Sequence, residues 1–410
     1  MYRVLGIIAE YNPFHNGHLY HLQQSKKEAN CDYTICVISG NFVQRGESSL
    51  VNKWVKAQMA LESGADLVLE LPTIYSISSA ENFAEGGIKL LDSLGIVNVL
   101  SFGSETSDMA VLNEFANVLY SQPKEYLSLL NHELGTGISY PKARENAILM
   151  YLNDIRRYAN VLSAPNNILG IEYLKALKKQ RSNIQPLNIV RKDVGYHEDS
   201  IHNHMASASF IRKMVRNNKI AQLSEIMPSS SFSLLEEEVK KGNIVSDLSR
   251  YEKIIIYNLR KMTTKEISQI PDVTEGLENA IKQAACSCNS ISEFMNIVKC
   301  KRYTETRIKR ILLYALLNIT KKEMELSKRV IPYIRVLGFN QNGKQLLSGI
   351  ATTNPKLPII TSVKKFFDHN TNKQVENLLK IDIFSTDIYT LGYEYDSWAG
   401  LDFTKKIVEI

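Results

Sequence analysis

The chain has 410 residues, of which 44% are hydrophobic and 22% charged, and its formal net charge is +6 at pH 7. This composition is typical of a globular protein with two or three domains, and it excludes a disordered or fibrous chain. No apolar stretch reaches membrane-spanning length, and the five cysteines lack zinc-like or disulfide-framework spacing, so we expect a cytoplasmic protein with reduced thiols and no membrane contact.

Strands and helices alternate in the first part of the chain. Short apolar runs predict strands at residues 4–9, 33–38, 67–71, 97–103 and 187–191. Amphipathic stretches between them predict helices at residues 19–29, 53–63, 79–94 and from 166 onward. This alternation predicts an α/β fold with a doubly wound parallel sheet. Ligands bind such sheets at the carboxyl ends of the strands, where residues 10–18, 40–47 and 103–105 would meet.

Residues 10–18, with the sequence EYNPFHNGH, join the first strand to the first helix. A helix N-terminus after a buried strand offers backbone N–H groups and a positive dipole end to an anion. His15 and His18 lie three residues apart and point the same way, while Gly17 lets a nucleotide approach the backbone. A metal pair or two surface histidines are the alternatives. No further ligand cluster follows, so the context favours phosphate binding and predicts no protein-held metal.

A second anion-binding pattern occupies residues 205–212, with the sequence MASASFIR. Its hydroxyl groups on Ser207 and Ser209, a helix N-terminus and Arg212 suit a triphosphate, although a plain helix N-cap gives the same pattern. We assign residues 1–217 to a nucleotide-binding domain that contains a mostly helical insertion at about 106–160.

Beyond residue 217 helical patterns dominate, at about 231–241, 246–262, 274–285 and 304–319, and predict a helical domain over 218–330. Residues 299–329 hold ten Lys or Arg and three Glu, which gives a local net charge of +7. Such a segment forms either a polyanion-binding face or a solvated helix face. The candidate RNA contacts are Lys301, Arg302, Arg307 and Arg310.

Residues 331–410 mix short strand and helix patterns and predict a small α+β segment. Four aromatic residues gather near its end. Because Tyr and Trp are usually well buried, we expect them in the core rather than stacked on bases. They are Tyr389, Tyr393, Tyr395 and Trp398.

The HxGH pattern at 15–18 and the SASFIR pattern at 207–212 together resemble the nucleotidyltransferase superfamily, whose fold is Rossmann-like. The superfamily's late motif usually reads Ile-Ser-Ser/Thr-Thr-x-Ile-Arg, from which this chain departs at Ala206 and Ala208. More closely, EYNPFHNGH at 10–18, GNFVQRGE at 40–47 and RYTETRIKRIL at 302–312 resemble the bacterial tRNA(Met) cytidine acetate ligase family, over essentially the whole chain.

This resemblance implies an enzyme that activates acetate with ATP as acetyl-adenylate. The acetyl group then passes to N4 of the wobble cytidine of elongator tRNA(Met), forming N4-acetylcytidine. Mg²⁺ is expected with the triphosphate, and no protein partner is implied. The implied ATP site comprises Ile7, Ile8, Ala9, Glu10, Tyr11, Asn12, Pro13, Phe14, His15, Asn16, Gly17, His18, Leu19, Tyr20, Gly103, Asn166 and Arg191. The choice of Asn166 over Asn167 stays open, and Ser207, Ser209 and Arg212 join the set from the late motif.

We expect His15 and His18 to be catalytic, as hydrogen-bond donors to phosphate oxygens when acetate attacks the α-phosphorus. For the acetate pocket the candidates are Asn41, Gln44 and Arg45, with Arg45 pairing with the carboxylate; a surface arginine is the alternative. Weaker candidates for phosphate contact are Lys53 and Lys56.

Two other functions remain open from the sequence. One is a small-molecule carboxylate or mononucleotide adenylyltransferase like pantothenate synthetase, against which the basic helical region argues. The other is a non-catalytic, nucleotide-bound RNA-binding protein, against which the two histidines and Arg212 argue.

Overall fold

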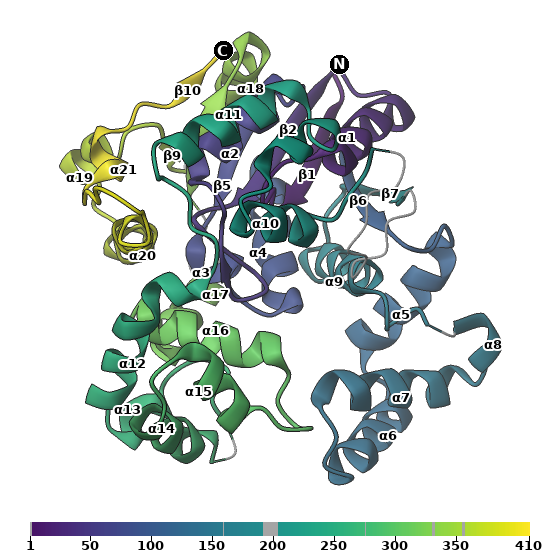
Figure 1. The fold of residues 1–410 in the computed structure, drawn as a ribbon. Helices are drawn as coiled ribbons and strands as arrows, with labels where there is room; N and C mark the ends of the chain where they lie inside the picture. The colour runs from purple at the N-terminus through teal and green to yellow at the C-terminus, as the bar shows by residue number, and fades with distance from the viewer. Residues whose placement is uncertain (1, 159, 192–203, 275, 330–332, 355–356) are drawn as a thin grey trace.

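An eight-stranded, mostly parallel sheet forms the centre of the protein (Figure 1). The computed structural model describes residues 2–158, 160–191, 204–274, 276–329, 333–354 and 357–410. The strand order is β10-β8-β5-β2-β1-β6-β7, with β9 paired to β8. The strands are β1 (Val4–Ala9), β2 (Tyr33–Ser39), β5 (Leu67–Leu71), β6 (Val99–Ser104), β7 (Gln185–Val190), β8 (Ile334–Phe339), β9 (Ile359–Ile360) and β10 (Val408–Glu409). A separate hairpin consists of β3 (Phe42–Val43) and β4 (Glu47–Ser48).

The predicted α/β fold is confirmed, because β5, β2, β1, β6 and β7 pair in parallel and correspond to the five predicted strands. Helices of the first part of the chain are α1 (Asn16–Ala29), α2 (Lys53–Glu62), α3 (Thr73–Ser76), α4 (Ala80–Ser93), α5 (Met109–Ser121), α6 (Lys124–Gly135), α7 (Tyr140–Leu152), α8 (Ile155–Tyr158), α9 (Pro165–Gln180) and α10 (Ala208–Arg216). α1 begins three residues before the predicted start, because His15 already caps it.

Helices also make up most of the second part of the chain. They are η1 (Ile220–Glu225), α11 (Ser229–Lys240), η2 (Leu248–Tyr251), α12 (Glu252–Lys261), α13 (Thr264–Ile267), α14 (Leu277–Ser287), α15 (Ile291–Val298), α16 (Glu305–Leu316), α17 (Lys321–Arg329), α18 (Gln341–Thr353), α19 (Val363–His369), α20 (Lys373–Thr390) and α21 (Leu401–Thr404).

Each face of the sheet carries its own apolar core. Along β1, Val4 and Ile8 pack into the core that includes α4, α9 and α18, whereas Leu5 and Ile7 pack into the core that includes α1, α2 and α11. Successive side chains of a strand point to opposite faces, so a strand covered on both sides reads as a continuous apolar run. This double coverage explains why β1 and β2 could be recognised from the sequence.

The helical insertion and the later helical region lie at the same end of the molecule in Figure 1, below the sheet. The insertion holds α5 to α8, and the later region holds α12 to α16. The β3–β4 hairpin contacts the later region directly, since Gly46, at φ +76°, leaves no space for a Cβ beside the backbone of Lys309 and Arg310. The hairpin therefore packs against α16.

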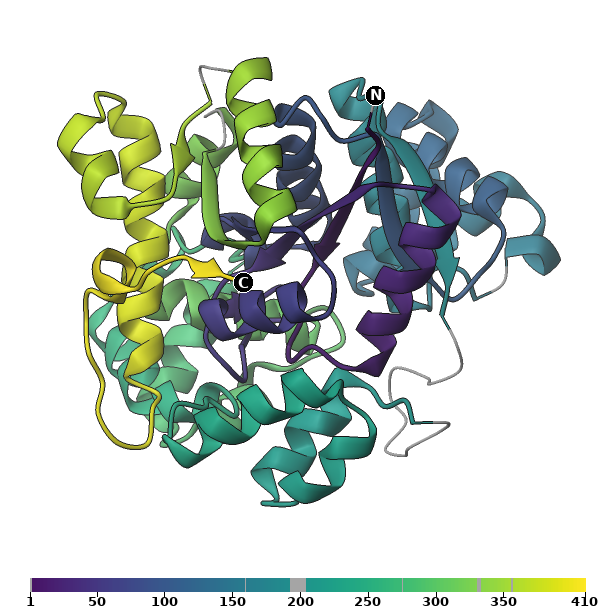
Figure 2. The same cartoon turned by 90° about the horizontal axis from the view of Figure 1, so that it is seen from above.

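Within 331–410, the described residues 333–354 and 357–410 do not form a sheet of their own. β8 joins the central sheet antiparallel to β5, and β10 pairs with β8, so the sheet is mixed at this side. Figure 2 shows the yellow C-terminal segment beside the purple and blue elements of the first part of the chain. A buried cluster ties the two together: the ammonium of Lys53 lies 2.9 Å from carboxylate oxygens of both Glu70 and Asp402, and Arg335 lies 3.3 Å from Asp402.

The prediction that four C-terminal aromatic residues lie in the core is partly wrong. Tyr389 is buried and Tyr393 partly buried, but the side chains of Tyr395 and Trp398 are each 69% exposed. Both residues lie in the loop between α20 and α21, where backbone contacts such as the bond from Glu394 N–H to the Gly242 carbonyl anchor the chain.

Candidate active site

His15 is the N-cap of α1. Its Nδ1 accepts a hydrogen bond from the backbone N–H of Gly17 at 3.0 Å. In a neutral imidazole one ring nitrogen accepts and the other carries the proton, so this bond places the proton of His15 on Nε2. The side chain is 4% exposed. Nδ1 thus caps the helix, and Nε2 is the ring atom that can donate a hydrogen bond to a ligand.

The two motif histidines are neutral near pH 7. Burial, with the nearby charges of Arg191 and Arg212, lowers the pKa of His15 to about 3. Burial also lowers the pKa of His18 well below its usual range, helped by His15 and Arg191. The rings stack with centroids 3.8 Å apart. Each therefore offers one N–H group rather than a full positive charge to an incoming phosphate.

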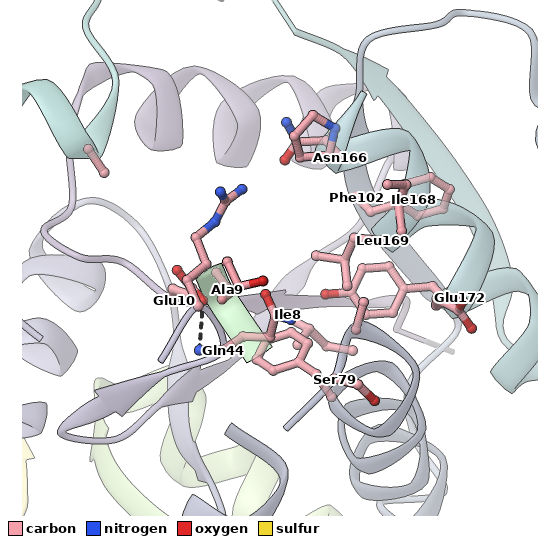
Figure 3. Close-up of a pocket in the computed structure, with 18 of the residues that line it drawn as sticks. Ile8, Ala9, Glu10, Gln44, Ser79, Phe102, Asn166, Ile168, Leu169 and Glu172 are labelled. Atoms are coloured by element: carbon pink, nitrogen blue, oxygen red, sulfur yellow. Dashed lines mark hydrogen bonds between the residues drawn. The ribbon is translucent and has the colours of Figure 1, made fainter. Parts of the chain in front are cut away.

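A cavity of about 690 Å³ opens beside these histidines, which is large enough for a nucleotide (Figure 3). It lies at the carboxyl ends of β1, β6 and β7, as expected for such a sheet. The structure brings most of the predicted nucleotide site to its walls: Ile7, Ile8, Ala9, Glu10, Tyr11, His15, Gly17, His18, Tyr20, Gly103, Asn166, Arg191, Ser207 and Arg212.

The remaining predicted nucleotide-site residues do not line this cavity. They are Asn12, Pro13, Phe14, Asn16, Leu19 and Ser209. Buried Asn12 instead supports the turn, because its Oδ1 accepts the Leu50 N–H at 2.7 Å and its amide donates to the Ser48 carbonyl. Asn16 donates to the carbonyls of His204 and Glu225.

The late motif combines a helix cap with a cation in the cavity wall. Ser207 caps α10, since its Oγ accepts the N–H of Phe210 at 3.1 Å. Arg212 donates to the carbonyl of Asn12 at 3.0 Å and pairs with Glu47 at 2.8 Å. Ser207 is therefore an N-cap, which was the alternative for this motif, and it also lines the cavity.

Glu47 links the nucleotide side of the cavity to the basic helical region. Its two carboxylate oxygens pair with Arg212, from α10, and with Lys309, from α16, at 2.8 and 3.1 Å. Burial raises the pKa of Glu47, but Arg212 and Lys309 outweigh it and hold the value below the usual range. The carboxylate stays ionised and bridges the two parts.

The four candidate RNA contacts differ in their surroundings. Arg302 is exposed at the cavity wall, and Lys301 is exposed outside it. Arg307 and Arg310 share a face of α16, as predicted, but that face is turned inward: Arg307 donates to the Asp272 carbonyl and Arg310 pairs with the Asp272 carboxylate, both within 2.9 Å. These two guanidinium groups hold α16 in place while lining the cavity.

Comparison with known proteins identifies the family. The family described as HIGH Nucleotidyl Transferase matches residues 2–400. A protein of Thermoanaerobacter sp. (strain X514) named tRNA(Met) cytidine acetate ligase is 46% identical, covering 99% of this chain and 100% of the relative. Its namesake from Acetivibrio thermocellus is 40% identical and covers 99% of both chains. This chain belongs to the tRNA(Met) cytidine acetate ligase family.

Solved structures agree with that assignment. The apo structure of Thermotoga maritima TmcAL matches with a TM-score of 0.95, and TmcAL bound with alpha-thio ATP matches with 0.92. Each is 33% identical and covers 100% of this chain and 99% of the other. The nucleotidyltransferase fold predicted from the two motifs is thereby confirmed for this ligase family member.

Three residues that we predicted to contact acetate or phosphate do not line the cavity of this family member. Asn41 is buried away from the cavity, where its Oδ1 accepts the Lys53 N–H and its amide donates to Thr386. Lys53 is enclosed by the carboxylates of Glu70 on β5 and Asp402 of the C-terminal segment. Lys56 is buried and donates to backbone carbonyls, including Ser39 and Gly40 at 2.7 Å. The other acetate-pocket candidates, Gln44 and Arg45, do line the cavity.

Sequence reasoning missed a wall that comes from the insertion and α9. Tyr140 and Arg144 of α7 line the cavity, and Arg144 pairs with buried Glu172 at 2.5 Å. Figure 3 shows Phe102, Ile168 and Leu169 along the same wall. The sequence offered one signal, the apolar residues after Asn166, which predicted a helix but not that this helix lines the cavity.

The neighbouring asparagines have separate roles. Asn166 lines the cavity, and its amide donates to Glu105 Oε1 at 2.6 Å. Buried Asn167 instead accepts the backbone N–H groups of Glu105 and Thr106. The cavity position agrees with the choice of Asn166.

Within the described part of the chain, no group of three or more His, Cys, Asp or Glu side chains is placed to hold a metal ion. Among the same residues, no helix is long and apolar enough to cross a bilayer.

Proposed function

We propose that this protein is an ATP-dependent ligase that converts acetate to acetyl-adenylate and transfers the acetyl group to N4 of the wobble cytidine of elongator tRNA(Met). One observation carries the proposal. A single cavity is lined both by the histidine-capped N-terminus of α1 and by arginines of the basic helical region. A nucleotide site and a polyanion-binding surface thus open on the same space. The names of the relatives supply the identity of the two substrates.

In the first step an acetate oxygen attacks the α-phosphorus of ATP and pyrophosphate leaves. Such a reaction depends on positioning and on stabilising the charge that develops on the phosphate oxygens. Neutral His15 and His18 supply N–H donors, and Arg191 and Arg212 supply positive charge beside them. Gln44 and Arg45 remain the candidates for the acetate carboxylate, since both line the cavity near Glu10.

Mg²⁺ accompanies the triphosphate in this proposal. The carboxylates around the cavity do not fit a protein cage for the ion, because Glu47, Glu81, Glu172 and Asp272 are engaged in ion pairs. Phosphate oxygens and water are then its ligands, a common arrangement for this ion. We assign it no separate step.

In the second step the exocyclic amine of cytidine attacks the acetyl carbonyl and AMP leaves. The base has to leave its stack and enter the cavity, which a single-stranded anticodon loop permits. Arg302, exposed at the cavity wall, is placed to contact the RNA backbone, with Lys301 next to it. Because the substrate is a tRNA, the reaction belongs in the cytoplasm.

Acetate-dependent exchange of labelled pyrophosphate into ATP tests the first step, and nucleoside analysis of added tRNA tests the second. We expect exchange with acetate and N4-acetylcytidine in tRNA(Met). Exchange with another carboxylate and unchanged tRNA would identify a small-molecule adenylating enzyme instead. Salt-dependent tRNA binding without any exchange would identify a non-catalytic RNA-binding protein.

Variants of the basic segment separate the two steps. Arg302→Ala is expected to weaken tRNA binding and to reduce the slope of log affinity against log salt by about 1, without changing pyrophosphate exchange. Lys344→Ala, at an exposed residue of α18, is the matched control for loss of one positive charge. An unchanged salt slope in Arg302→Ala would remove this residue from the RNA contact.

A further inference from the structure

Glu10 stands apart from the other carboxylates that line the cavity. Each of the other four makes an ion pair: Glu47 with Arg212, Glu81 with Lys175, Glu172 with Arg144, and Asp272 with Arg310, at 2.5 to 2.8 Å. Glu10 has no ion pair to any residue that the structure describes. Its Oε1 accepts the backbone N–H of Gln44 at 3.0 Å, drawn as a dashed line in Figure 3.

The carboxylate of Glu10 does not favour the binding of ATP or of acetate. It follows the last residue of β1 and lines the cavity that also holds His15, His18 and Arg212. Triphosphate and acetate are both anions, and a carboxylate beside them repels them. A group that opposes the binding of both anions has another use in the reaction, and the remaining reactant is the amine of cytosine.

The chemistry of that amine fits a carboxylate. N4 of cytosine carries two N–H donors, which Asp and Glu side chains accept in nucleic-acid recognition. Its lone pair is delocalised into the ring, so it is a weak nucleophile and has to lose a proton as it attacks. A positioned side chain that takes this proton typically accelerates such a step by about 10²- to 10⁴-fold.

We propose that Glu10 is the general base of the acetyl-transfer step: its free carboxylate oxygen, Oε2, receives a hydrogen bond from N4–H of the cytosine and then takes that proton. This inference rests on the proposed function. The N4–C bond forms at the acetyl carbonyl as the proton moves to Glu10. The bond from the acetyl carbon to the AMP oxygen breaks, AMP leaves with the electron pair, and Glu10 later releases the proton to water.

The surroundings of Glu10 suit this task. Burial raises the pKa of its carboxyl above the usual value and the nearby carboxylate of Glu47 adds to the rise, although Arg45, Arg212 and Lys56 oppose it. A raised pKa makes the ionised carboxylate a stronger base. The Gln44 N–H occupies Oε1 and orients the side chain, so that Oε2 is the oxygen left for the amine.

Glu10→Gln tests the proposal with little change in shape. Glutamine keeps an oxygen that accepts the Gln44 N–H, but it cannot take a proton. Three rates are compared: acetate-dependent pyrophosphate exchange, acetyl transfer to tRNA in a single turnover, and formation of acetyl hydroxamate from hydroxylamine. Hydroxylamine is a strong nucleophile that needs no base from the protein. Exposed Glu236→Gln on α11 is the matched control and leaves all three rates unchanged.

We expect the ratio of tRNA transfer to exchange to fall at least a hundredfold in Glu10→Gln, while the ratio of hydroxamate formation to exchange stays within about threefold of the unaltered enzyme. Transfer by the unaltered enzyme should rise with pH through one ionisation that Glu10→Gln lacks. Glu10→Asp restores part of the transfer because it keeps a carboxylate.

An unchanged transfer-to-exchange ratio in Glu10→Gln would refute the proposal, as would an equal loss of hydroxamate and tRNA transfer. If Glu10→Gln does not fold, Glu10→Asp takes its place in the test. The proposal is overturned if Glu10→Asp has the same pH profile as the unaltered enzyme and full transfer at every pH. A shifted ionisation with slower transfer supports it. Absence of exchange in the unaltered enzyme would instead refute the proposed function, since adenylation does not use this base.

Discussion

His15 allows its two ring nitrogens to be tested separately. Nδ1 accepts the Gly17 N–H and caps α1, while Nε2 carries the proton and faces the nucleotide site in our proposal. In His15→Asn, the Oδ1 atom replaces Nδ1 and keeps the cap, but no atom replaces Nε2. In His15→Gln, the side-chain amide reaches the place of Nε2, but the cap acceptor is lost. The two variants are therefore complementary.

The expected magnitudes follow from these contacts. Losing an N-cap costs about 1 kcal/mol of stability, with a range of about 0.5 to 2. Losing one hydrogen-bond donor to a developing oxyanion costs about 10²- to 10³-fold in rate, or about 3 to 4 kcal/mol. We expect His15→Asn to unfold at nearly the same urea concentration and to lose about 10²- to 10³-fold in pyrophosphate exchange. His15→Gln should lose about 1 kcal/mol of stability and much less activity.

Urea unfolding and acetate-dependent pyrophosphate exchange, measured on both variants, give the two quantities. Exchange within twofold of the unaltered enzyme in His15→Asn would contradict this prediction, because no donor at Nε2 would then be needed. An equal loss of activity in both variants, in proportion to lost stability, would also contradict it. His132→Asn, at an exposed histidine of α6, is the control for the substitution itself.

Three further predictions concern stability and coupling. Lys53→Met leaves buried carboxylates without their cation and should lower the free energy of unfolding by about 3 to 5 kcal/mol in urea melts. The folded-state pKa values of His15 and His21 are lowered to about 3 and about 4, so as the pH falls the unfolded chain binds protons before the folded chain does. The free energy of unfolding should therefore be constant above about pH 7. It should fall by up to about 1.4 kcal/mol per pH unit for each histidine as the pH drops from 6.5 toward 4. Gly46→Ala places a Cβ within 2.6 Å of the Arg310 backbone N at positive φ, so α16 must move, and tRNA transfer should fall more than pyrophosphate exchange.

Local patterns in the sequence were sufficient for the central sheet and for the histidine motif. β1 and β2 are buried on both faces, and α1 starts at the His15 cap with a glycine two residues later, so each signal lies within a few residues. The place of β8 was not predictable in the same way. Its run from Ile334 to Phe339 is apolar apart from Arg335, but antiparallel pairing with β5 joins segments more than 260 residues apart. Arg335 takes part in the buried Lys53 cluster, whose other members also come from distant parts of the chain.

The polar residues of the site show a similar limit. Asn41, Gln44 and Arg45 lie in one short segment, yet Asn41 turns into the core while the other two line the cavity. A side chain's direction in a loop depends on the partner that it finds, here Thr386 from the other end of the chain. The same holds for Arg310, whose charge is paired with Asp272 rather than free for RNA.

The contacts of the β3–β4 hairpin imply that the two half-reactions are coupled through it. Glu47 pairs with Arg212 of the late motif and with Lys309 of α16, and Gly46 packs against the backbone of the same helix. The hairpin also supplies the Gln44 N–H that orients Glu10. A shift of α16 on binding RNA would therefore be transmitted to Arg212 and to Glu10 at once. Both steps use residues held by this one hairpin, so binding of tRNA should alter the rate of pyrophosphate exchange even though exchange itself requires no RNA.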